Sequence, residues 1–235
     1  MSQPSNPNNQ ADTLQIPLSR VIGFVRQLSH DLRNHLNAAE LQAAYMNEVT
    51  TDAEMKSEVL RLRGMFSDMG SSLQKLSGAL AEIRLTPMPY EAPAFMEDLR
   101  SRLQSQFPEE AKSVQWTVEV EKAQLNIDPQ NLQAAFLELF GNAFQHSRSK
   151  EAMEASAAIT ASEFIFTLRE PKTQFEGSTD KWGHEPFAKV MHGHYGLGLH
   201  RARSIIEAHG GQFEAQFDPA RASLFTTIAL PIHQV

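Results

Sequence analysis

The chain has 235 residues, a net charge of −7 and no cysteine. This length allows one or two domains with a sizeable core, and the acidic balance argues against nucleic acid as a main partner. The lack of cysteine excludes disulfides, thiol nucleophiles and thiolate metal sites, and it suits a cytoplasmic protein. No apolar run reaches the roughly 20 residues of a membrane span, so we expect no membrane insertion.

The first part of the chain is expected to form a helical hairpin. Residues 1–13 are polar and rich in Asn, Pro and Gln, which predicts a disordered tail. Within residues 14–86, two apolar series alternate steps of three and four, from Leu18 to Met46 and from Met55 to Ile83. Thr50, Thr51 and Asp52 lie between them and can cap the second helix. Because a lone hairpin cannot cover both apolar stripes, we expect a homodimer with a four-helix bundle.

One histidine of the first helix has polar neighbours that suit phosphoryl chemistry. His30 is followed by Asp31, and Asn34 lies four residues on, on the same helix face. Asp31 can accept an imidazole N–H, which fixes the nitrogen that is free to attack. The same segment also fits a solvent-facing histidine of a coiled coil, so these residues alone leave both interpretations open.

The rest of the chain, residues 87–235, mixes helices and strands without strict alternation, which predicts an α+β fold. Thr86 to Pro89 break the second helix and form a linker. A helix should begin at Pro129, where Asp128 provides an N-cap, and another should end at Gly210-Gly211. Residues 171–195 resemble a lid. The other expected elements are a helix over 92–107, a helix over 199–209, and strands over 114–120, 123–127, 157–159, 164–168, 213–217 and 224–230.

Three motifs of this second part have a fixed order. They are Glu138-Leu139-Phe140-Gly141-Asn142-Ala143, then Glu185-Pro186-Phe187, then Tyr195-Gly196-Leu197-Gly198-Leu199. Behind a heptad hairpin that carries His30, they resemble the asparagine, phenylalanine and second glycine boxes of two-component histidine kinases. The resemblance covers the chain from about residue 15 to its end. It implies a dimerisation and histidine-phosphotransfer hairpin over 14–86, then an α/β-sandwich ATP-binding domain over 87–235.

The resemblance also implies roles for the hairpin residues. His30 would accept the γ-phosphoryl group of ATP and pass it to an aspartate on the receiver domain of a response regulator. Asp31 would accept the imidazole proton. The Asp31-x-x-Asn34 pattern resembles the family's phosphatase signature, in which the amide orients the water that hydrolyses a phospho-aspartate.

In the second domain, the resemblance implies a site for ATP and Mg²⁺. Asn142 would ligate Mg²⁺, because an amide oxygen is a suitable hard ligand. Glu138 stands where many members of the family carry another asparagine, and a glutamate there would activate water or the acceptor, as in the related gyrase-type ATPases. Gly196 and Gly198 would let backbone N–H groups approach the phosphates at the start of a helix.

The first glycine box departs from the family pattern. Glu170 replaces the aspartate that contacts the adenine amino group, and Lys172 and Gln174 replace two glycines. A hydrogen bond to a charged group contributes roughly 1.5–3 kcal/mol. Its loss would weaken nucleotide binding by about 10- to 150-fold.

Three functions therefore stay open. The first is a histidine kinase core with a divergent adenine pocket, which the intact Asn142 and Gly198 motifs favour. The second is a histidine phosphotransferase or response-regulator phosphatase that does not use ATP. The third is a noncatalytic dimeric scaffold that binds a response regulator.

Overall fold

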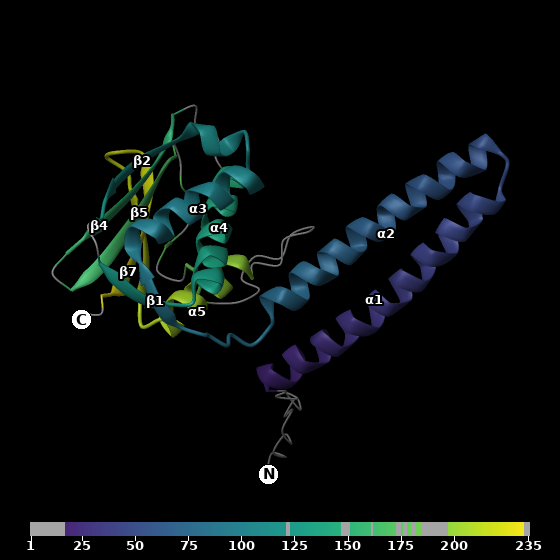
Figure 1. Ribbon diagram of the computed structural model, residues 1–235, viewed down its shortest axis with the longest axis horizontal. Coiled ribbons are helices and arrows are strands. Elements are labelled where there is room, and N and C mark those ends of the chain that lie inside the picture. The colour runs from purple at the N-terminus through teal and green to yellow at the C-terminus, as the bar shows by residue number, and fades with distance from the viewer. Residues whose placement is uncertain are drawn as a thin grey trace, which may run out of the picture. The chain divides into compact units, whose positions relative to one another are not determined.

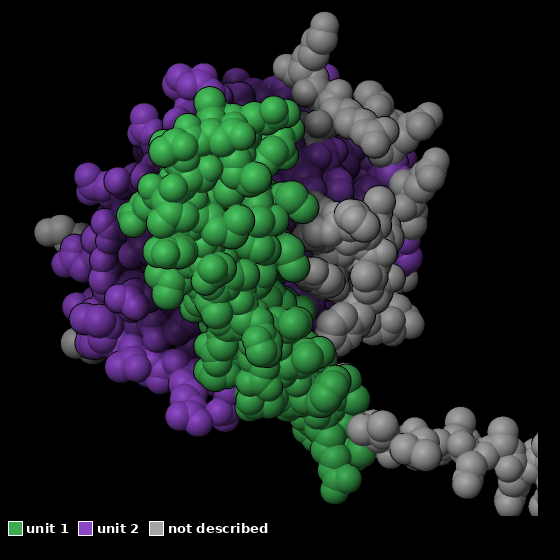
Figure 2. Space-filling view, turned by 90° about the vertical axis from the view of Figure 1, so that its right-hand side faces the viewer, with its two compact units in different colours: residues 1–80 green, residues 81–235 purple. Residues whose placement is uncertain are grey.

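The computed structural model describes residues 17–120, 123–146, 151–160, 162–172, 175, 178–179, 182–184 and 197–232. The chain divides into two compact units, Met1–Leu80 and Ala81–Val235, which Figure 2 colours separately. The predicted domain boundary lies six residues later, at 86/87.

The first unit is an antiparallel helical hairpin, as the apolar spacing predicts. Helix α1 spans Leu18–Val49 and helix α2 spans Ala53–Ala79, joined by a turn of three residues (Figure 1). The Asp52 side chain accepts hydrogen bonds from the backbone N–H groups of Glu54 and Met55, at 2.8 and 3.3 Å, and so caps α2. Neither α1, α2 nor any other helix in the described part of the chain is both long and apolar enough to cross a membrane.

The prediction that α2 continues to Ile83 and the linker is wrong. The helix ends at Ala79, and the Arg26 guanidinium donates from Nε to the Leu80 carbonyl oxygen at 2.9 Å. Ile83 instead packs against the apolar core of the second unit. The heptad pattern predicts that Ile83 packs within the helical hairpin, whereas it packs against the core of the second unit.

The hairpin leaves many large apolar side chains in water. Ala43 and Val59 are buried between the two helices, on the stripe that the heptads predict. Other apolar side chains, including several of the heptad series, stay uncovered in the single chain, which is unusual for a monomeric surface. The exposed side chains are Val21, Phe24, Leu28, Leu32, Leu41, Tyr45, Met46, Val49, Met55, Leu60, Leu62, Met65 and Met69.

The second unit is a two-layer α/β sandwich. Its five-stranded sheet has the order β2-β4-β5-β7-β6, in which β2 and β4 are parallel and the other pairs are antiparallel. Figure 1 shows the helices of this unit gathered on one side of that sheet. The strands are β2 Val114–Glu119, β4 Met153–Ile159, β5 Glu163–Pro171, β6 Gln212–Asp218 and β7 Ser223–Pro231, and the helices are α3 Ala92–Gln106, α4 Pro129–His146 and α5 Gly198–Ala208, with a 3₁₀ turn at Glu110–Ser113.

A short additional strand lies inside the predicted linker. Strand β1, Met88–Glu91, pairs antiparallel with β3, Gln124–Ile127. Pro87 and Pro89 indicate a break in the chain, but proline is compatible with a strand that has a free edge. The expectation that this segment is only a linker is therefore wrong.

Aromatic rings fill the space between the helices and the sheet. Phe95 of α3 packs edge-on against Phe136 of α4 with 5.4 Å between ring centroids. Phe136 in turn contacts Phe166 of β5 at 4.8 Å. Each such ring contributes roughly 1.5–3 kcal/mol through burial, and edge-on packing fixes the rotation of α4 about its axis. The polar face of α4 is thereby held in one orientation.

Candidate active site

His30 lies on an exposed face of α1 beside both predicted partners. Its side chain is 65% exposed, whereas the preceding Ser29 is buried at 2% exposure. The imidazole Nδ1 lies 3.3 Å from Oδ1 of Asp31 and 3.4 Å from Nδ2 of Asn34. Gln27 donates to the same Asp31 oxygen at 2.9 Å and holds the carboxylate in place. The three hairpin residues predicted from the sequence therefore form one cluster.

The two contacts of Nδ1 belong to different tautomers of the imidazole. A carboxylate only accepts, so the Asp31 contact needs a hydrogen on Nδ1, while the Asn34 amide can donate only to a bare Nδ1. In the tautomer that donates to Asp31, Nε2 carries the lone pair and faces solvent. The contact with Asp31 thus favours the tautomer in which Nε2 is the unprotonated nitrogen.

In the second unit, α4 is fixed at its start by a buried aspartate. Asp128 Oδ1 accepts the backbone N–H of Asn131 at 3.0 Å, and Oδ2 accepts the Asn131 amide at 2.9 Å and the Thr86 N–H at 3.0 Å. Burial alone would raise the pKa of this carboxyl, but hydrogen bonds from Asn131, Thr86 and Gln130 outweigh it and hold the pKa below its ordinary value. The Asp128 N–H itself donates to Nε2 of His209, at the end of α5, at 2.9 Å.

We expect Asp128→Ala to lower the free energy of unfolding of the second unit by about 1–2 kcal/mol at neutral pH, because the N-cap is lost. A carboxyl whose pKa is lowered on folding stabilises the protein above its unfolded pKa, and that contribution is lost as the pH falls through the folded pKa. The difference between wild type and variant should therefore shrink below the ordinary value of 3.8.

Urea denaturation followed by tryptophan fluorescence checks this, since both tryptophans, Trp116 and Trp182, belong to the second unit. Asp52→Ala is the matched control, because it removes the cap of α2 in the first unit. A loss below about 0.5 kcal/mol for Asp128→Ala, less than typical cap removal, would contradict the assigned role.

Glu138 and Gly198 come together where α4 passes the start of α5. A Cβ placed on Gly198 would lie 2.5 Å from Oε2 of Glu138, so the carboxylate rests directly on this glycine. Asn142 is four residues after Glu138 on α4 and therefore shares its face. The N-cap of α5, Leu197, makes no side-chain hydrogen bond to the helix start. The first N–H groups of α5 are thus without the side-chain cap that α4 has.

The strand registers place Glu170 at this same end of the unit. Asp128 meets His209 at one end of the α4–α5 pair, and Glu138 meets Gly198 toward the other, so the two helices are antiparallel. Gly211, in the turn after α5, lies against Ala229 of β7. Ala229 pairs with Ile165, near the start of β5. Glu170 lies five residues along β5 from Ile165, away from that turn. The start of α5 lies on the same side, since the helix ends at the turn.

Glu170 itself is buried, and Lys172 lies against it. The lysine Nζ lies 3.1 Å from Oε2, with side-chain exposures of 11% for Lys172 and 4% for Glu170. Burial raises the pKa of the Glu170 carboxyl, and the neighbouring Lys172 charge opposes that rise. The predicted replacement of an adenine-contacting aspartate is therefore a carboxylate that already has a cationic neighbour.

Several predicted residues lie outside the described part of the chain. They are Gly196 of the glycine turn, Gln174 of the first glycine box, and the motif Glu185-Pro186-Phe187. Their assignments stay predictions.

The structure adds one group that the motifs do not identify. Arg203 of α5 is buried, and its Nε donates to the Trp182 carbonyl oxygen at 3.0 Å while its guanidinium stacks over Phe213, 4.7 Å from the ring centroid. Nδ1 of His200 lies 3.0 Å from the Gly183 carbonyl oxygen. α5 thus holds residues 182–183 of the predicted lid. The sequence signal that could have indicated this contact is an arginine on the apolar side of an amphipathic helix, because an arginine is rarely buried there without a partner.

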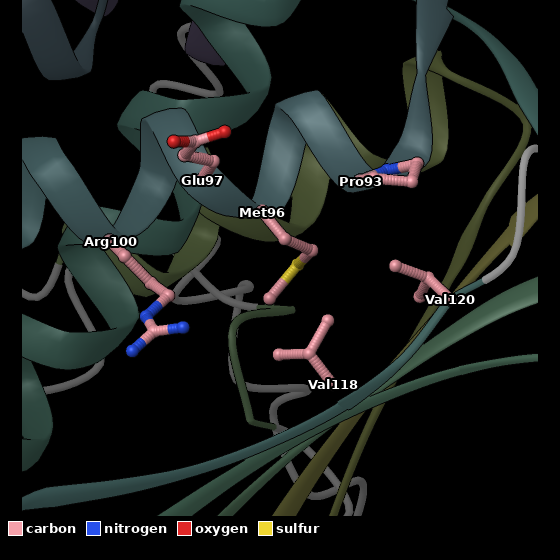
Figure 3. A pocket seen from close by; sticks show the side chains of 6 residues that line it. All are labelled: Pro93, Met96, Glu97, Arg100, Val118 and Val120. Atoms are coloured by element: carbon pink, nitrogen blue, oxygen red, sulfur yellow. The ribbon is translucent and has the colours of Figure 1, made fainter.

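A pocket of about 440 Å³ lies elsewhere in this unit, between α3 and the edge strand β2 (Figure 3). The side chains of Met96, Val118 and Val120 converge on it, whereas Glu97 points away. Its remaining lining residues are Pro93 and Arg100. None of the predicted site residues lines it, so we assign it no part in the chemistry below.

The order of the two units and the topology within each identify the class of fold. A helical hairpin followed by an α/β sandwich matches the fold of solved histidine kinases, which confirms the resemblance seen in the motifs at the level of the fold. No protein-family model matches the chain.

Comparison with known proteins agrees with this fold. The solved structure of full-length ShkA in complex with AMPPNP superposes with a TM-score of 0.70 at 18% identity, over 91% of this chain and 46% of ShkA. The Acinetobacter baumannii histidine kinase AdeS gives a TM-score of 0.52 at 17% identity, over 87% of this chain and 98% of that one. The alginate biosynthesis sensor protein KinB of Pseudomonas aeruginosa is 24% identical over 231 residues, which cover 89% of this chain and 36% of KinB. The chain thus spans about a third of that curated relative.

Proposed function

We propose that the chain is a cytoplasmic histidine kinase core of a two-component system. It transfers the γ-phosphoryl group of ATP to His30 and then to an aspartate on the receiver domain of a response regulator. The observation that carries this proposal is the contact of His30 Nδ1 with Asp31 Oδ1 at 3.3 Å on an exposed helix face. The KinB likeness and the histidine kinase fold support the same class of signalling.

The chemistry at His30 follows from the tautomer that Asp31 favours. Nε2 attacks the γ-phosphorus, the bond from that phosphorus to the β–γ bridging oxygen breaks, and ADP leaves. The hydrogen on Nδ1 stays hydrogen-bonded to the Asp31 carboxylate. The positive charge that develops on the ring therefore lies beside a negative charge. Transfer to the regulator then breaks the P–N bond as an aspartate oxygen attacks. The exposure of His30 supports both steps, because two different partners must reach it.

Glu138, Asn142 and the start of α5 are the groups that we propose for nucleotide binding. The amide oxygen of Asn142 and the carboxylate of Glu138 are hard oxygen donors on one face of α4, which fits Mg²⁺. No group of three or more acidic, histidine or cysteine ligands occurs among the described residues, and Mg²⁺ commonly uses one or two protein ligands together with phosphates and water. When bound, the ion neutralises phosphate charge. The start of α5 at Gly198 can receive phosphate oxygens on its N–H groups, with Gly196 as the proposed companion.

The exposed apolar side chains of the hairpin support a homodimer. Burying them against a second copy gives the four-helix bundle that the heptads predict. The net charge of −7 argues against nucleic acid as a partner, and we propose no membrane partner for this core. The bound AMPPNP in the ShkA structure supports ATP as the phosphoryl donor.

Two measurements on the intact chain test the proposal. Calorimetric titration with AMPPNP and Mg²⁺ should detect binding, and incubation with γ-labelled ATP should give an acid-labile, base-stable label. Mass spectrometry under non-acidic conditions should place that label on His30. An absence of both binding and label at millimolar nucleotide would overturn the kinase proposal.

The second candidate function is a phosphotransferase or response-regulator phosphatase without ATP chemistry. The observation that favours it is the ion pair between Lys172 and the buried Glu170, since it occupies the proposed adenine contact. Ready phosphoryl transfer to His30 from a phosphorylated regulator, with no label from ATP, would select this function. A noncatalytic scaffold would show partner binding and no phosphoryl transfer in any assay.

Asn34→Ala tests the phosphatase activity separately. Because the exposed amide of Asn34 can orient a water toward a phospho-aspartate, we expect the rate of regulator dephosphorylation to fall by about tenfold or more. Labelling of His30 should persist, since Asp31 still holds the ring. The measurement is the decay of phosphorylated regulator in the presence of each protein. An equal loss of both activities would instead mean that Asn34 has a structural role.

A further inference from the structure

Glu170 of β5 carries a buried carboxylate. It points to the same side of β5 as Phe164, Phe166 and Leu168, which are fully buried in the core. Its Oε2 is shielded from solvent, and the Lys172 ammonium lies 3.1 Å away. An ionised carboxylate can accept about four hydrogen bonds. One cationic neighbour therefore leaves Glu170 able to accept a further donor from a ligand at this end of the domain.

Lys172 is held so that its ammonium group lies on that oxygen. Its backbone N–H donates to the Ala222 carbonyl oxygen at 2.7 Å, and the buried Pro171 joins it to Glu170. The side chain folds back along the strand end, and Nζ lies 3.1 Å from Oε2. This is an ion pair in which the ammonium also donates a hydrogen bond to the carboxylate. It occupies only part of the hydrogen-bonding capacity of the carboxylate.

This pair is buried, unlike a second lysine ion pair among the described residues of the unit. Lys112 and Glu109 also pair, at 2.8 Å, but their side chains are 64% and 79% exposed. Water screens the exposed pair, so it contributes little. Within the buried pair, each charge depends on the other, because removal of one leaves the other desolvated and unpaired.

We propose that Lys172 is an internal competitor for the Glu170 carboxylate, which the amino-bearing edge of a nucleotide base must displace to bind. This inference rests on the proposed function, since it assumes that a nucleotide enters at Glu138, Asn142 and Gly198. A base amino group is a neutral donor, whereas Lys172 is a tethered cation that is present at all times. Lys172 therefore lowers nucleotide affinity, and it restricts binding to bases that can donate to Glu170.

The first test is the nucleotide affinity of Lys172→Met. We expect its Kd for AMPPNP with Mg²⁺, measured by calorimetry, to be lower than that of wild type by about tenfold or more, because the competing ion pair is gone. Lys112→Met is the matched control, and its Kd should equal that of wild type. An unchanged or weaker Kd for Lys172→Met, with wild type still binding, would overturn this inference alone. If wild type and both variants fail to bind at millimolar AMPPNP, the proposed function and this inference both fail.

A second test needs no substitution, in case Lys172→Met does not fold. Amine-reactive labelling of the unaltered protein, quantified by mass spectrometry, measures how accessible each lysine is. We expect the labelling rate of Lys172 to rise several-fold when AMPPNP and Mg²⁺ saturate the protein, because displacement moves the ammonium into solvent. Lys112 should label at the same rate throughout. Slower or unchanged labelling of Lys172 in the saturated protein would overturn the inference, since a bound lysine or an undisturbed pair would be protected.

Discussion

Replacement of His30 by glutamine should abolish all phosphoryl transfer by the protein. Glutamine keeps the size and polarity of an exposed helical residue but has no nucleophilic ring nitrogen. We expect no acid-labile label after incubation with γ-labelled ATP, and no transfer of label to any response regulator. The loss should exceed about a thousandfold, since no other group can replace the attacking nitrogen. Nucleotide binding, measured by calorimetry, should be unchanged because His30 lies in the other compact unit.

His35→Gln provides the matched control. His35 is also exposed on α1 and stands five residues after His30, on a different face of the helix. It lacks an adjacent carboxylate, since Leu36 follows it. Full labelling of His35→Gln beside none for His30→Gln would assign the chemistry to one imidazole. If His30→Gln retains an acid-labile label, the phosphoacceptor assignment is wrong.

The parts of the fold that sequence reasoning predicts are those fixed by local periodicity. Alternating steps of three and four define α1 and most of α2, because residues at this spacing share one face of a helix. Asp128 followed by Pro129 predicts the start of α4, since an N-cap and a proline at the first position act within one turn. The His30 cluster is predicted for the same reason, because all its members lie within one or two turns.

The parts that sequence reasoning misses depend on distant residues. The end of α2 is set by Arg26 and by the second unit that covers Ile83, neither of which is visible in local spacing. Strand β1 exists only because β3 pairs with it some thirty-five residues later in the chain. Lys172 and Glu170 are only two residues apart in the sequence. The strength of their ion pair nevertheless depends on the burial of both side chains, which the folded domain provides. Periodicity carries no information about such neighbours.

The two units divide the chemistry in a way that separate substitutions can resolve. In the proposed mechanism, the hairpin provides the nucleophile and the carboxylate that orients it, and the sandwich provides the groups for the phosphates. A substitution in the sandwich should therefore affect phosphorylation by ATP and leave the intrinsic reactivity of His30 unchanged. Asn142 is the best position for this test, because it is half-buried on α4 and is proposed to act only through the bound nucleotide.

Asn142→Ala should abolish labelling by ATP while His30 stays competent to accept phosphate from another donor. Removing the amide oxygen takes away the proposed Mg²⁺ ligand, so we expect the labelling rate to fall by about a hundredfold or more. Alanine is well tolerated in a helix, so α4 should remain folded. With phosphoramidate as the donor, the variant and wild type should label at the same rate, because that reaction needs no nucleotide.

Asn131→Ala is the matched control on the same helix. The Asn131 amide donates to Asp128 at the start of α4, at 2.9 Å, so its loss should lower stability and leave labelling by ATP intact. Normal labelling of Asn142→Ala would show that the amide is not a magnesium ligand. If Asn142→Ala loses labelling from both ATP and phosphoramidate, the defect lies in folding or dimerisation rather than in the nucleotide site. Only a loss confined to ATP places Asn142 at the phosphates, because only that reaction requires the sandwich to deliver the phosphoryl group to the hairpin.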